Sequence, residues 1–395
     1  MSSDIALIDG VQAAAVARPG SQDAVAEVLR TAARDKLTVV PCGAGTKLDW
    51  GCPPRSADIL LDVSALDAVV EHVAGDLVVR VQPGVRLSSL AVELARANQR
   101  LAIDGVVPGS TVGGIVSTAL SGPSRLLYGT VRDLLIGITV VRADGAVTHS
   151  GGKVVKNVAG YDLGKLYTGA YGSLGVITEA IFRLHPVPEA AAWVVADLPD
   201  ERAVGTAVAA VLDSQVMASA LEICRPAPAG PITVAVLLEG VAPGVKARSA
   251  AVSALLGSGA ATGDEAPSWW SVLPGPIILK LTAEIALVPP LLRGLREAAA
   301  VTRLAVDVRG SAGVGVLFAG LAADADPEAT GRFVLAARAH CRDAGGFAVL
   351  LRAPAAVRAR VDAWGPVAGL SLMRRLKDEF DPDHRMAPGR FVGGL

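Results

Sequence analysis

The sequence predicts an α+β protein of two domains, and three observations point to that class. Residues 1–187 carry three glycine-rich loops between short strand and helix patterns. After Pro186 these loops become rarer, and a β–α–β–β–α pattern begins that then recurs. That pattern is typical of an antiparallel sheet with helices on one face. We therefore expect a first domain over 1–187, a second over 188–375, and a tail over 376–395 that packs back on the first.

The elements of the first domain follow from local patterns. Ser21 can cap a helix over 21–36, because its hydroxyl accepts a backbone N–H bond and Val25, Val28 and Leu29 share one face. The strand-like LTVVP follows and ends in the loop CGAGTK. Further short strands are expected over 57–64 and 68–84, and a second helix over 87–99. The segment 134–149 predicts a hairpin around Asp144-Gly145.

In the second domain, apolar runs alternate with helical patterns. Strands are expected at WVVADL, ALEIC and ITVAVLLEG, with helices near 200–213 and 243–256. A similar pattern runs from IILKLTAEIAL to GFAVLLRAP. The last segment, MRRLKDEFDPDHRMAPGRFVGGL, predicts a helix followed by a tail that contains proline and glycine.

Composition excludes several classes of protein. The 37 basic and 38 acidic residues give a formal net charge of −1, so no basic surplus favours nucleic acid or an anionic membrane surface. The opening MSSDIALIDG lacks a cationic leader, and the apolar run near 275–292 is interrupted by Lys280 and Glu284, so neither a secretory signal nor a membrane span is expected. The four cysteines are dispersed without a C-x-x-C pair, which favours a reduced cytoplasmic protein with no metal site.

The glycine-rich loops do not match the common phosphate-binding fingerprints. In the stretch GGKVVKNVAGYDL, Lys153 is followed by Val154, where a P-loop needs Ser or Thr after its lysine. Around Gly43-Ala44-Gly45, Leu48 stands where a Rossmann fingerprint needs its third glycine. The three loops 41–47, 108–119 and 172–179 can still turn backbone N–H groups inward as anion-binding nests, without needing lysines. Taken singly, each loop is equally consistent with a tight turn.

The three loops together resemble the FAD-binding domain of vanillyl-alcohol-oxidase-type (PCMH-type) flavoproteins. The resemblance rests on Pro41-x-Gly43-x-Gly45-Thr46, Pro108-Gly109-Ser110-x-x-Gly113-Gly114 and Tyr128-Gly129-x-x-Arg132-Asp133. Lys156-Asn157-x-x-Gly160-Tyr161-Asp162-Leu163 and Gly172-x-Leu174-Gly175-Val176-Ile177-Thr178-Glu179 are similar to the glycolate oxidase and D-lactate dehydrogenase branch. With Asp362-x-Trp364-Gly365-Pro366, the sequence is most similar to the FAD-binding E subunit of bacterial glycolate oxidase. The resemblance is most specific over 105–187.

The resemblance implies a set of cofactor-binding residues. Loops 42–47 and 108–114 would wrap the FAD pyrophosphate with backbone amides, and the strand at Gly175 would meet the adenine end. Binding of the pyrophosphate would then need no charged side chains. The expected set is Cys42, Gly43, Ala44, Gly45, Thr46, Lys47, Pro108, Gly109, Ser110, Thr111, Gly113, Gly114, Ser117, Thr118, Tyr128, Gly129, Arg132, Gly175, Val176 and Ile177.

Two departures from the family pattern concern how the cofactor is held. Thr46 stands where some relatives carry the histidine that attaches FAD covalently, so non-covalent FAD is expected. The tail Met386-Ala387-Pro388-Gly389-Arg390 lacks the asparagine of the family's Asn-Pro-Gly ending, which argues against direct contact between tail and flavin.

Catalytic residues are less well defined. Oxidation of a 2-hydroxy acid needs a base for the hydroxyl proton. The histidine-bearing motif of the related catalytic D subunit is absent from the sequence, which leaves Lys156, Tyr161 and His384 as candidate bases. Structural roles compete for each of them: an ion pair for Lys156 with Asp162, a packed ring for Tyr161, and an exposed loop for His384. Arginines of the second domain could hold a substrate carboxylate, namely Arg309, Arg352 or Arg358.

The expected role is an FAD-binding subunit of a glycolate oxidase complex, working with a catalytic flavin subunit and an iron–sulfur subunit. It would be cytoplasmic, or peripheral at the inner membrane through the complex. Two alternatives stay open. One is a self-sufficient FAD-dependent 2-hydroxy-acid dehydrogenase, and the other is a flavin-stabilised scaffold without catalysis.

Overall fold

The computed structural model describes residues 6–153, 161–227 and 230–395, and these form two compact units. The first unit contains 1–121, 129–187 and 366–395, and the second contains 122–128 and 188–365. Both units are therefore assembled from separated pieces of chain. The short segment 122–128 belongs to the second unit, and the helix that precedes the tail belongs entirely to the first. Within the described ranges, none of the helices is both long and apolar enough to cross a membrane.

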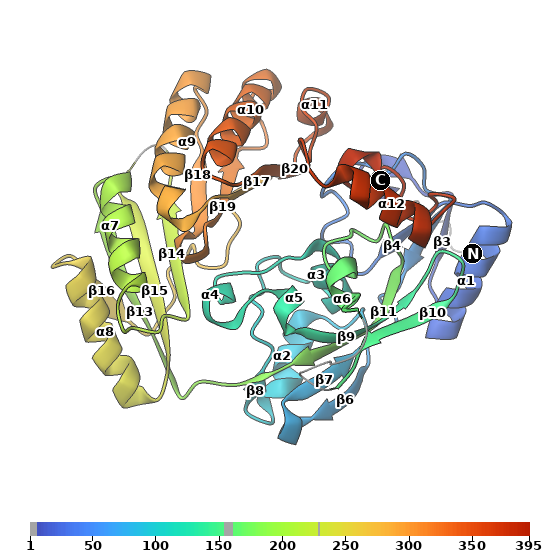
Figure 1. Ribbon diagram of the computed structural model, residues 1–395, viewed down its shortest axis with the longest axis horizontal. Helices are drawn as coiled ribbons and strands as arrows, with labels where there is room; N and C mark the ends of the chain where they lie inside the picture. The colour runs from blue at the N-terminus through green and yellow to red at the C-terminus, as the bar shows by residue number, and fades with distance from the viewer. Residues whose placement is uncertain (1–5, 154–160, 228–229) are drawn as a thin grey trace. The chain divides into compact units, whose positions relative to one another are not determined.

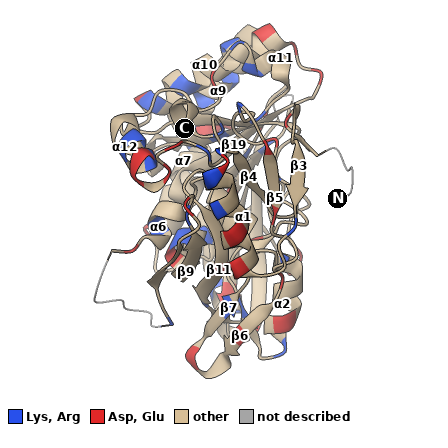
Figure 2. Cartoon of the chain, turned by 90° about the vertical axis from the view of Figure 1, so that its right-hand side faces the viewer, with Lys and Arg blue, Asp and Glu red and all other residues tan. Residues whose placement is uncertain are grey.

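A three-stranded parallel sheet opens the first unit. Its order is β3-β5-β4, with bounds Ala15–Ala17, Ile59–Asp62 and Val39–Cys42. Helix α1 (Gln22–Arg34) packs its buried face on this sheet, and Ser21 Oγ caps the helix by accepting Ala24 N–H at 3.1 Å. The outer face of α1 carries charges of both signs, among them the pair Arg30–Glu27 (Figure 2). The helix predicted over 21–36 is confirmed.

A five-stranded antiparallel sheet forms the other layer of this unit. Its order is β10-β9-β11-β7-β6, with bounds Val147–Gly151, Leu135–Val141, Val176–Arg183, Val78–Val81 and Val69–Val73. The hairpin predicted around Asp144-Gly145 is confirmed as β9–β10. The buried strand expected after the third glycine loop is β11.

Shorter elements complete the first unit. Two small antiparallel pairs are β1 (Leu7–Ile8) with β2 (Val11–Gln12), and β8 (Gln99–Arg100) with β12 (His185–Pro186). The helices are α2 (Leu87–Ala95), α3 (Val112–Thr118), α5 (Val131–Leu134), α6 (Gly164–Tyr167) and α12 (Leu370–Phe380), with 3₁₀ turns at Ala74–Asp76 and Val392–Gly394.

The second unit is one eight-stranded sheet with helices on one side (Figure 1). The order is β16-β13-β15-β14-β18-β19-β17-β20, and every pair is antiparallel. The bounds are Ala261–Gly263, Ala190–Leu198, Ile232–Gly240, Ala220–Arg225, Asp307–Ser311, Val316–Leu321, Ile277–Thr282 and Ala348–Arg352. The helices are α4 (Arg125–Tyr128), α7 (Glu201–Leu212), α8 (Ala242–Leu256), α9 (Val288–Thr302), α10 (Pro327–Asp343) and α11 (Ala355–Arg358), with 3₁₀ turns at Ile285–Leu287 and Ala312–Val314. The predicted helix-covered antiparallel sheet is confirmed.

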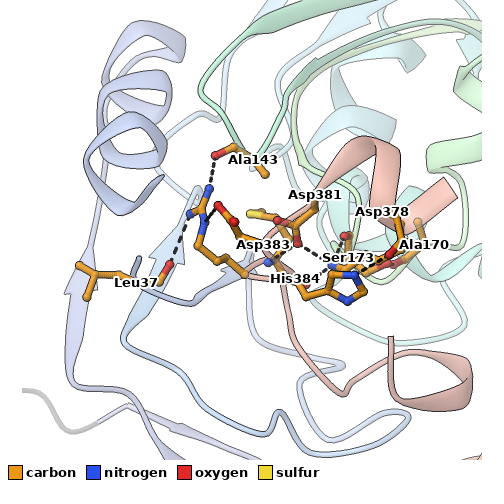
Figure 3. A network of polar contacts seen from close by, with 11 residues as sticks. Leu37, Ala143, Ala170, Ser173, Asp378, Asp381, Asp383 and His384 are labelled. Atoms are coloured by element: carbon orange, nitrogen blue, oxygen red, sulfur yellow. Dashed lines mark hydrogen bonds and ion pairs between the residues drawn. The ribbon is translucent and has the colours of Figure 1, made fainter. Parts of the chain in front are cut away.

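The C-terminal segment is anchored in the first unit by a buried ion pair. Lys377 in α12 donates three hydrogen bonds, to Asp381 Oδ2 at 2.7 Å, Ser173 O at 2.6 Å and Met386 O at 2.8 Å. Figure 3 labels Asp381 and Ser173, the two acceptors that Lys377 links in this network. Burial lowers the pKa of Lys377, and Asp381 opposes that shift. The ammonium group thus joins α12, the tail and the third glycine loop.

The tail then adds backbone contacts to the parallel sheet. Val39 N–H donates to Arg385 O at 2.9 Å, and Ala387 N–H donates to Val39 O at 2.8 Å. Arg385 is buried and donates to the backbone carbonyls of Ala143 and Leu37 (Figure 3). The tail is therefore a structural part of the first unit.

Candidate functional site

The first glycine-rich loop leaves the end of β4 and carries a buried cation. Lys47 is 7% exposed, and its ammonium donates to Ser110 Oγ at 2.7 Å and to Thr46 Oγ1 at 3.1 Å. Gly45 has φ +74, a left-handed backbone angle that glycine adopts without strain. The first loop is thereby tied to the second loop through Ser110.

The second loop runs into helix α3 and approaches two other backbone segments closely. Thr111 caps α3 by accepting Gly114 N–H at 3.3 Å. A Cβ added to Gly43 would lie 2.4 Å from Thr111 Oγ1, and one on Gly113 would lie 2.6 Å from Pro83 Cβ. A side chain at either glycine would displace Thr111 or Pro83, so both positions require glycine for this close approach.

The third loop brings the start of β11 to the same place. Gly172 has φ +74 and packs against Pro41, and Gly175 has φ +155 with Val140 directly behind its Cα. The positive φ angles turn the chain sharply before Val176 enters the sheet. The glycines of the third loop therefore serve turns and close backbone approach.

The three loops surround one pocket, built entirely from the first unit. Its lining consists of Pro41, Cys42, Gly43, Ala44, Gly45, Thr46, Lys47, Leu48, Val63, Pro83, Thr111, Gly113, Gly114, Ser117, Thr118, Tyr171, Gly172, Gly175, Val176, Ile177 and Arg390. Most of the expected cofactor residues are thus brought together. Pro108, Gly109 and Ser110 are not among the lining residues. Pro108 and Gly109 are exposed, and Ser110 is buried and accepts a hydrogen bond from Lys47.

Three expected residues lie elsewhere. Tyr128 belongs to the second unit, where its hydroxyl donates to Glu239 Oε2 at 3.1 Å. Gly129 packs against Asp133 at the start of α5, and Arg132 is exposed on that short helix. None of the three lines the pocket.

Arg390 lines the pocket although its position in the tail gave no local signal. It is 3% exposed and donates to Trp50 O at 3.1 Å. Burial lowers the pKa of Arg390, while Tyr171 and Asp9 partly offset the effect. Next to it, Tyr171 and Phe391 pack with ring centroids 5.9 Å apart. The missing tail asparagine suggested no tail contact, yet the tail supplies a guanidinium to this pocket.

Lys47 and Arg390 give the pocket two buried cations from opposite ends of the sequence. Two positive charges in the lining favour an anionic occupant, because ammonium and guanidinium groups form charge-assisted hydrogen bonds to phosphate. A diphosphate has that charge, and the glycine-walled loops would admit it close to the backbone N–H groups. The residues present therefore fit FAD. Two cationic side chains line a pocket for which the sequence predicted only uncharged backbone donors.

The two candidate bases that the structure describes, Tyr161 and His384, do not line the pocket. Lys156 lies outside the described residues. Tyr161 is 91% exposed, and Asp162 forms a surface pair with Lys165 at 3.2 Å. His384 Nε2 lies 2.7 Å from Asp378 Oδ1 on the surface of the tail (Figure 3).

Comparison with known proteins defines the class. Residues 13–151 match the family described as FAD binding domain, so the chain carries an FAD-binding domain. The chain is 32% identical over 213 residues to glycolate oxidase subunit GlcD of Bacillus subtilis, covering 53% of this chain and 44% of that protein. It is 36% identical over 169 residues to glycolate oxidase subunit GlcE of Escherichia coli, covering 42% and 48%. The chain thus matches less than half the length of these curated relatives.

Solved structures show the same fold at low identity. Alkyldihydroxyacetonephosphate synthase superposes with a TM-score of 0.71 at 17% identity, covering 94% of this chain and 75% of that one. Glucooligosaccharide oxidase from Acremonium strictum, which carries a 6-S-cysteinyl, 8α-N1-histidyl FAD, gives a TM-score of 0.67 at 15% identity, covering 94% and 90%. The fold is that of the vanillyl-alcohol-oxidase-type flavoproteins, as the sequence predicted.

Proposed function

We propose that this chain is an FAD-dependent oxidoreductase that acts on glycolate or a related 2-hydroxy acid. We further propose that it works as the FAD-binding subunit of a glycolate-oxidase-type complex. The observation that carries the proposal is the pocket in which three glycine-rich loops enclose Lys47 and Arg390. The relatives named as glycolate oxidase subunits support the substrate class.

Within that pocket the residues would divide the binding of FAD. Lys47 and Arg390 would neutralise the diphosphate, and the backbone of loops 42–47 and 111–114 would donate N–H bonds to it. Val176 and Ile177, at the start of β11, would contact the adenine end. When bound, FAD supplies the acceptor for the hydride that leaves the substrate.

We propose that FAD is held without a covalent bond. Thr46 replaces the histidine of the covalent type, and the described residues of the lining include no histidine. Cys42 is the one thiol among the lining residues that the structure describes, and burial with nearby Asp62 raises its pKa to about 11. A thiol that stays protonated is a poor nucleophile. Acid precipitation of the holoprotein should therefore release all of the FAD to the supernatant.

The proposal of a subunit role rests on the relatives and on the cysteine pattern. The four cysteines are free and occupy separate elements, so this chain offers no cysteine set for an iron–sulfur cluster. Any iron–sulfur relay would therefore come from a partner subunit, and a catalytic flavin subunit would complete the complex.

The test is an anaerobic titration of the purified chain with glycolate while the visible spectrum is recorded. A yellow protein that bleaches on its own supports the oxidoreductase and favours self-sufficient catalysis. A yellow protein that bleaches only after the partner subunits are added supports the subunit role. D-lactate is titrated in parallel, because a D-lactate dehydrogenase is also among the relatives. A chain that retains no FAD would contradict the proposal.

A further inference from the structure

The eight-stranded sheet of the second unit has two edges, and only one of them is covered by neighbouring chain. At the β20 edge, Leu350 N–H donates to Ala363 O at 2.8 Å, and Arg338 Nη2 donates to the same carbonyl at 2.9 Å. The segment at 363 therefore covers the outer side of β20. At the other edge lies β16, a strand of three exposed residues next to α8 (Figure 1).

The outer side of β16 is open. Within the described ranges, the backbone of Ala261–Gly263 bonds to β13 alone. Proteins usually protect a free edge with lysine, proline, a bulge or a covering segment, because open N–H and C=O groups pair with other strands. The sequence Ala-Thr-Gly contains neither lysine nor proline, and its pairing with β13 has no bulge, so short length is the protection that remains. An edge of this kind favours the addition of another strand.

A groove runs between this edge and α8. Its walls are mostly apolar and include Val245 and Ala250 of α8 and Ala192 of β13. Ser249 also lines the groove. This side chain is 5% exposed, and its Oγ has no hydrogen-bond partner among the described residues. Because buried hydroxyl groups are normally hydrogen-bonded, the groove is incomplete in the single chain.

Two charges of opposite sign, Lys246 and Asp264, also line the groove. Both are exposed, and no ion pair joins either of them to another described residue. The groove therefore offers a carboxylate and a buried hydroxyl to a cation, and an ammonium to an anion. A second copy of the same surface would supply both partners at once, because residues i and j meet reciprocally across a two-fold axis.

The register of α8 on β16 shows how the two copies would align. Ser253 Oγ lies 3.2 Å from Thr262 Oγ1, so Thr262 faces α8. The helix and the strand are joined by a short turn at 257–260 and run in opposite directions. At about 3.4 Å per strand residue and about 1.5 Å per helical residue, Asp264 lies beside residues 248–249 of α8, within one turn of Lys246.

Antiparallel pairing of two β16 strands about an axis at Gly263 would place Asp264 of one copy opposite Thr262 of the other. Residues that pair directly across antiparallel strands point to the same face, so this Asp264 would lie on the side of α8. Lys246 of each copy would then reach Asp264 of the other, and its ammonium would enter the groove beside the Ser249 hydroxyl.

We propose that two copies of this chain associate through β16, with antiparallel strand pairing and two reciprocal Lys246–Asp264 ion pairs. The association joins the two eight-stranded sheets into one continuous sheet. All residues of this surface belong to the second unit, so the proposal does not depend on the cofactor pocket or on the proposed function.

The test is sedimentation equilibrium of the full chain from about 1 to 100 µM, because small interfaces give dissociation constants in the micromolar range. We expect a reversible monomer–dimer equilibrium. Lys246→Glu and Asp264→Lys should each weaken the dimer at least about tenfold, because each change turns two attractions per dimer into repulsions. The double variant Lys246→Glu/Asp264→Lys exchanges the two charges and should restore the dimer to within about threefold of the wild type.

Lys36→Glu is the matched control, because Lys36 is an exposed lysine of the first unit without an ion pair among the described residues. Its dimer should be as stable as that of the wild type. A chain that stays monomeric over the whole range would overturn the proposal. So would a dimer that Lys246→Glu and Asp264→Lys leave unchanged, or a double variant that is no more dimeric than the single ones.

Hydrogen exchange provides an independent readout of where the copies meet. As the concentration rises and the dimer forms, backbone amides of Ala261–Gly263 should exchange more slowly, because new strand pairing protects them. Amides of β20 should not change, because that edge is already covered. A dimer without added protection at β16 would show that another face is used and would overturn the proposal.

The same measurement distinguishes a second copy from a strand of another protein. A monomer whose β16 amides become protected only when a different subunit is added would assign the edge to that subunit and overturn self-association. Protection that appears with the chain alone, and that Lys246→Glu removes, supports the proposal.

Discussion

Replacing Lys377 by methionine should destabilise the first unit strongly. Lys377 is 1% exposed and Asp381 is 0% exposed. The substitution keeps the aliphatic volume but removes the cation that neutralises Asp381. The carboxylate would then keep only the Met386 N–H bond, at 2.7 Å, because Asp381 Oδ1 has no hydrogen-bond partner. Ser173 O and Met386 O would lose their donor as well.

The magnitude follows from the burial of the pair. Removing one partner of a buried ion pair typically costs about 3–5 kcal/mol, because the other charge stays in a low-dielectric site. The double variant Lys377→Met/Asp381→Asn removes both charges and keeps an amide oxygen for Met386 N–H. We expect it to recover about 0.5–3 kcal/mol of the loss, which is the usual range of coupling between residues in contact.

The assay combines urea unfolding followed by far-UV circular dichroism with hydrogen exchange at Ala387, whose N–H bonds to Val39 O. Lys165→Met is the control, because Lys165 and Asp162 form an exposed pair at 3.2 Å, and such a pair contributes at most about 1 kcal/mol. Lys377→Met should unfold at lower urea and exchange Ala387 faster. A free energy of unfolding within about 0.5 kcal/mol of the wild type would refute the reasoning, since surface substitutions fall in that range.

Three further changes test a cation of the pocket, a closely packed glycine and the half-buried Lys280 of β17. Lys47→Met should weaken FAD binding about 10- to 100-fold, because charge-assisted hydrogen bonds are lost. The fluorescence of released FAD measures this, and the control Lys165→Met should bind FAD as the wild type does. Gly175→Ala should cost about 2–4 kcal/mol, because φ is +155 and its Cβ would lie 2.7 Å from Val140 Cγ1, whereas Gly75→Ala, with open space around it, should be tolerated in the same urea assay. Lys280→Met should stabilise the fold at pH 7 by up to about 3 kcal/mol, from a pKa lowered from 10.5 to about 8. The unfolded chain holds this proton up to pH 10.5, so the difference in free energy of unfolding between Lys280→Met and the wild type should shrink between pH 8 and 10.5. A difference that does not change with pH would show that the charge of Lys280 is not its cause.

Much of the local structure could be predicted because its causes are local. Ser21 and the apolar spacing after it specify α1, and Asp144-Gly145 specifies the turn of a hairpin. The loop at Gly43 could be assigned to a cofactor site because glycine, in a recurring order of loops, marks close backbone approach. These signals lie within a few residues of the elements that they determine.

The features that could not be predicted from the sequence depend on contacts between distant segments. Arg390 looks like an ordinary basic residue near the end of the sequence until the tail brings it beside Trp50. Lys377 and Asp381, four residues apart, look like a solvent-exposed helix pair, yet both are buried. Tyr128 was grouped with the cofactor loops, but the segment 122–128 belongs to the second unit. Periodicity cannot report which side chains a later segment will cover.

The discontinuity of the first unit has a consequence for biosynthesis. Arg390 and Lys47, which meet at the pocket, are separated by 343 positions in the sequence. The ribosome must complete the whole second unit before the tail can pair with Val39. Closing the long loop between Val39 and the tail has an entropic cost, and this cost falls if the intervening unit is already compact. The pocket should therefore form late, after translation of the segment that matches the FAD-binding family. A nascent chain stalled after residue 187 would present the glycine loops without the Arg390 guanidinium that completes the pocket. Tight binding of FAD would therefore require translation through Arg390.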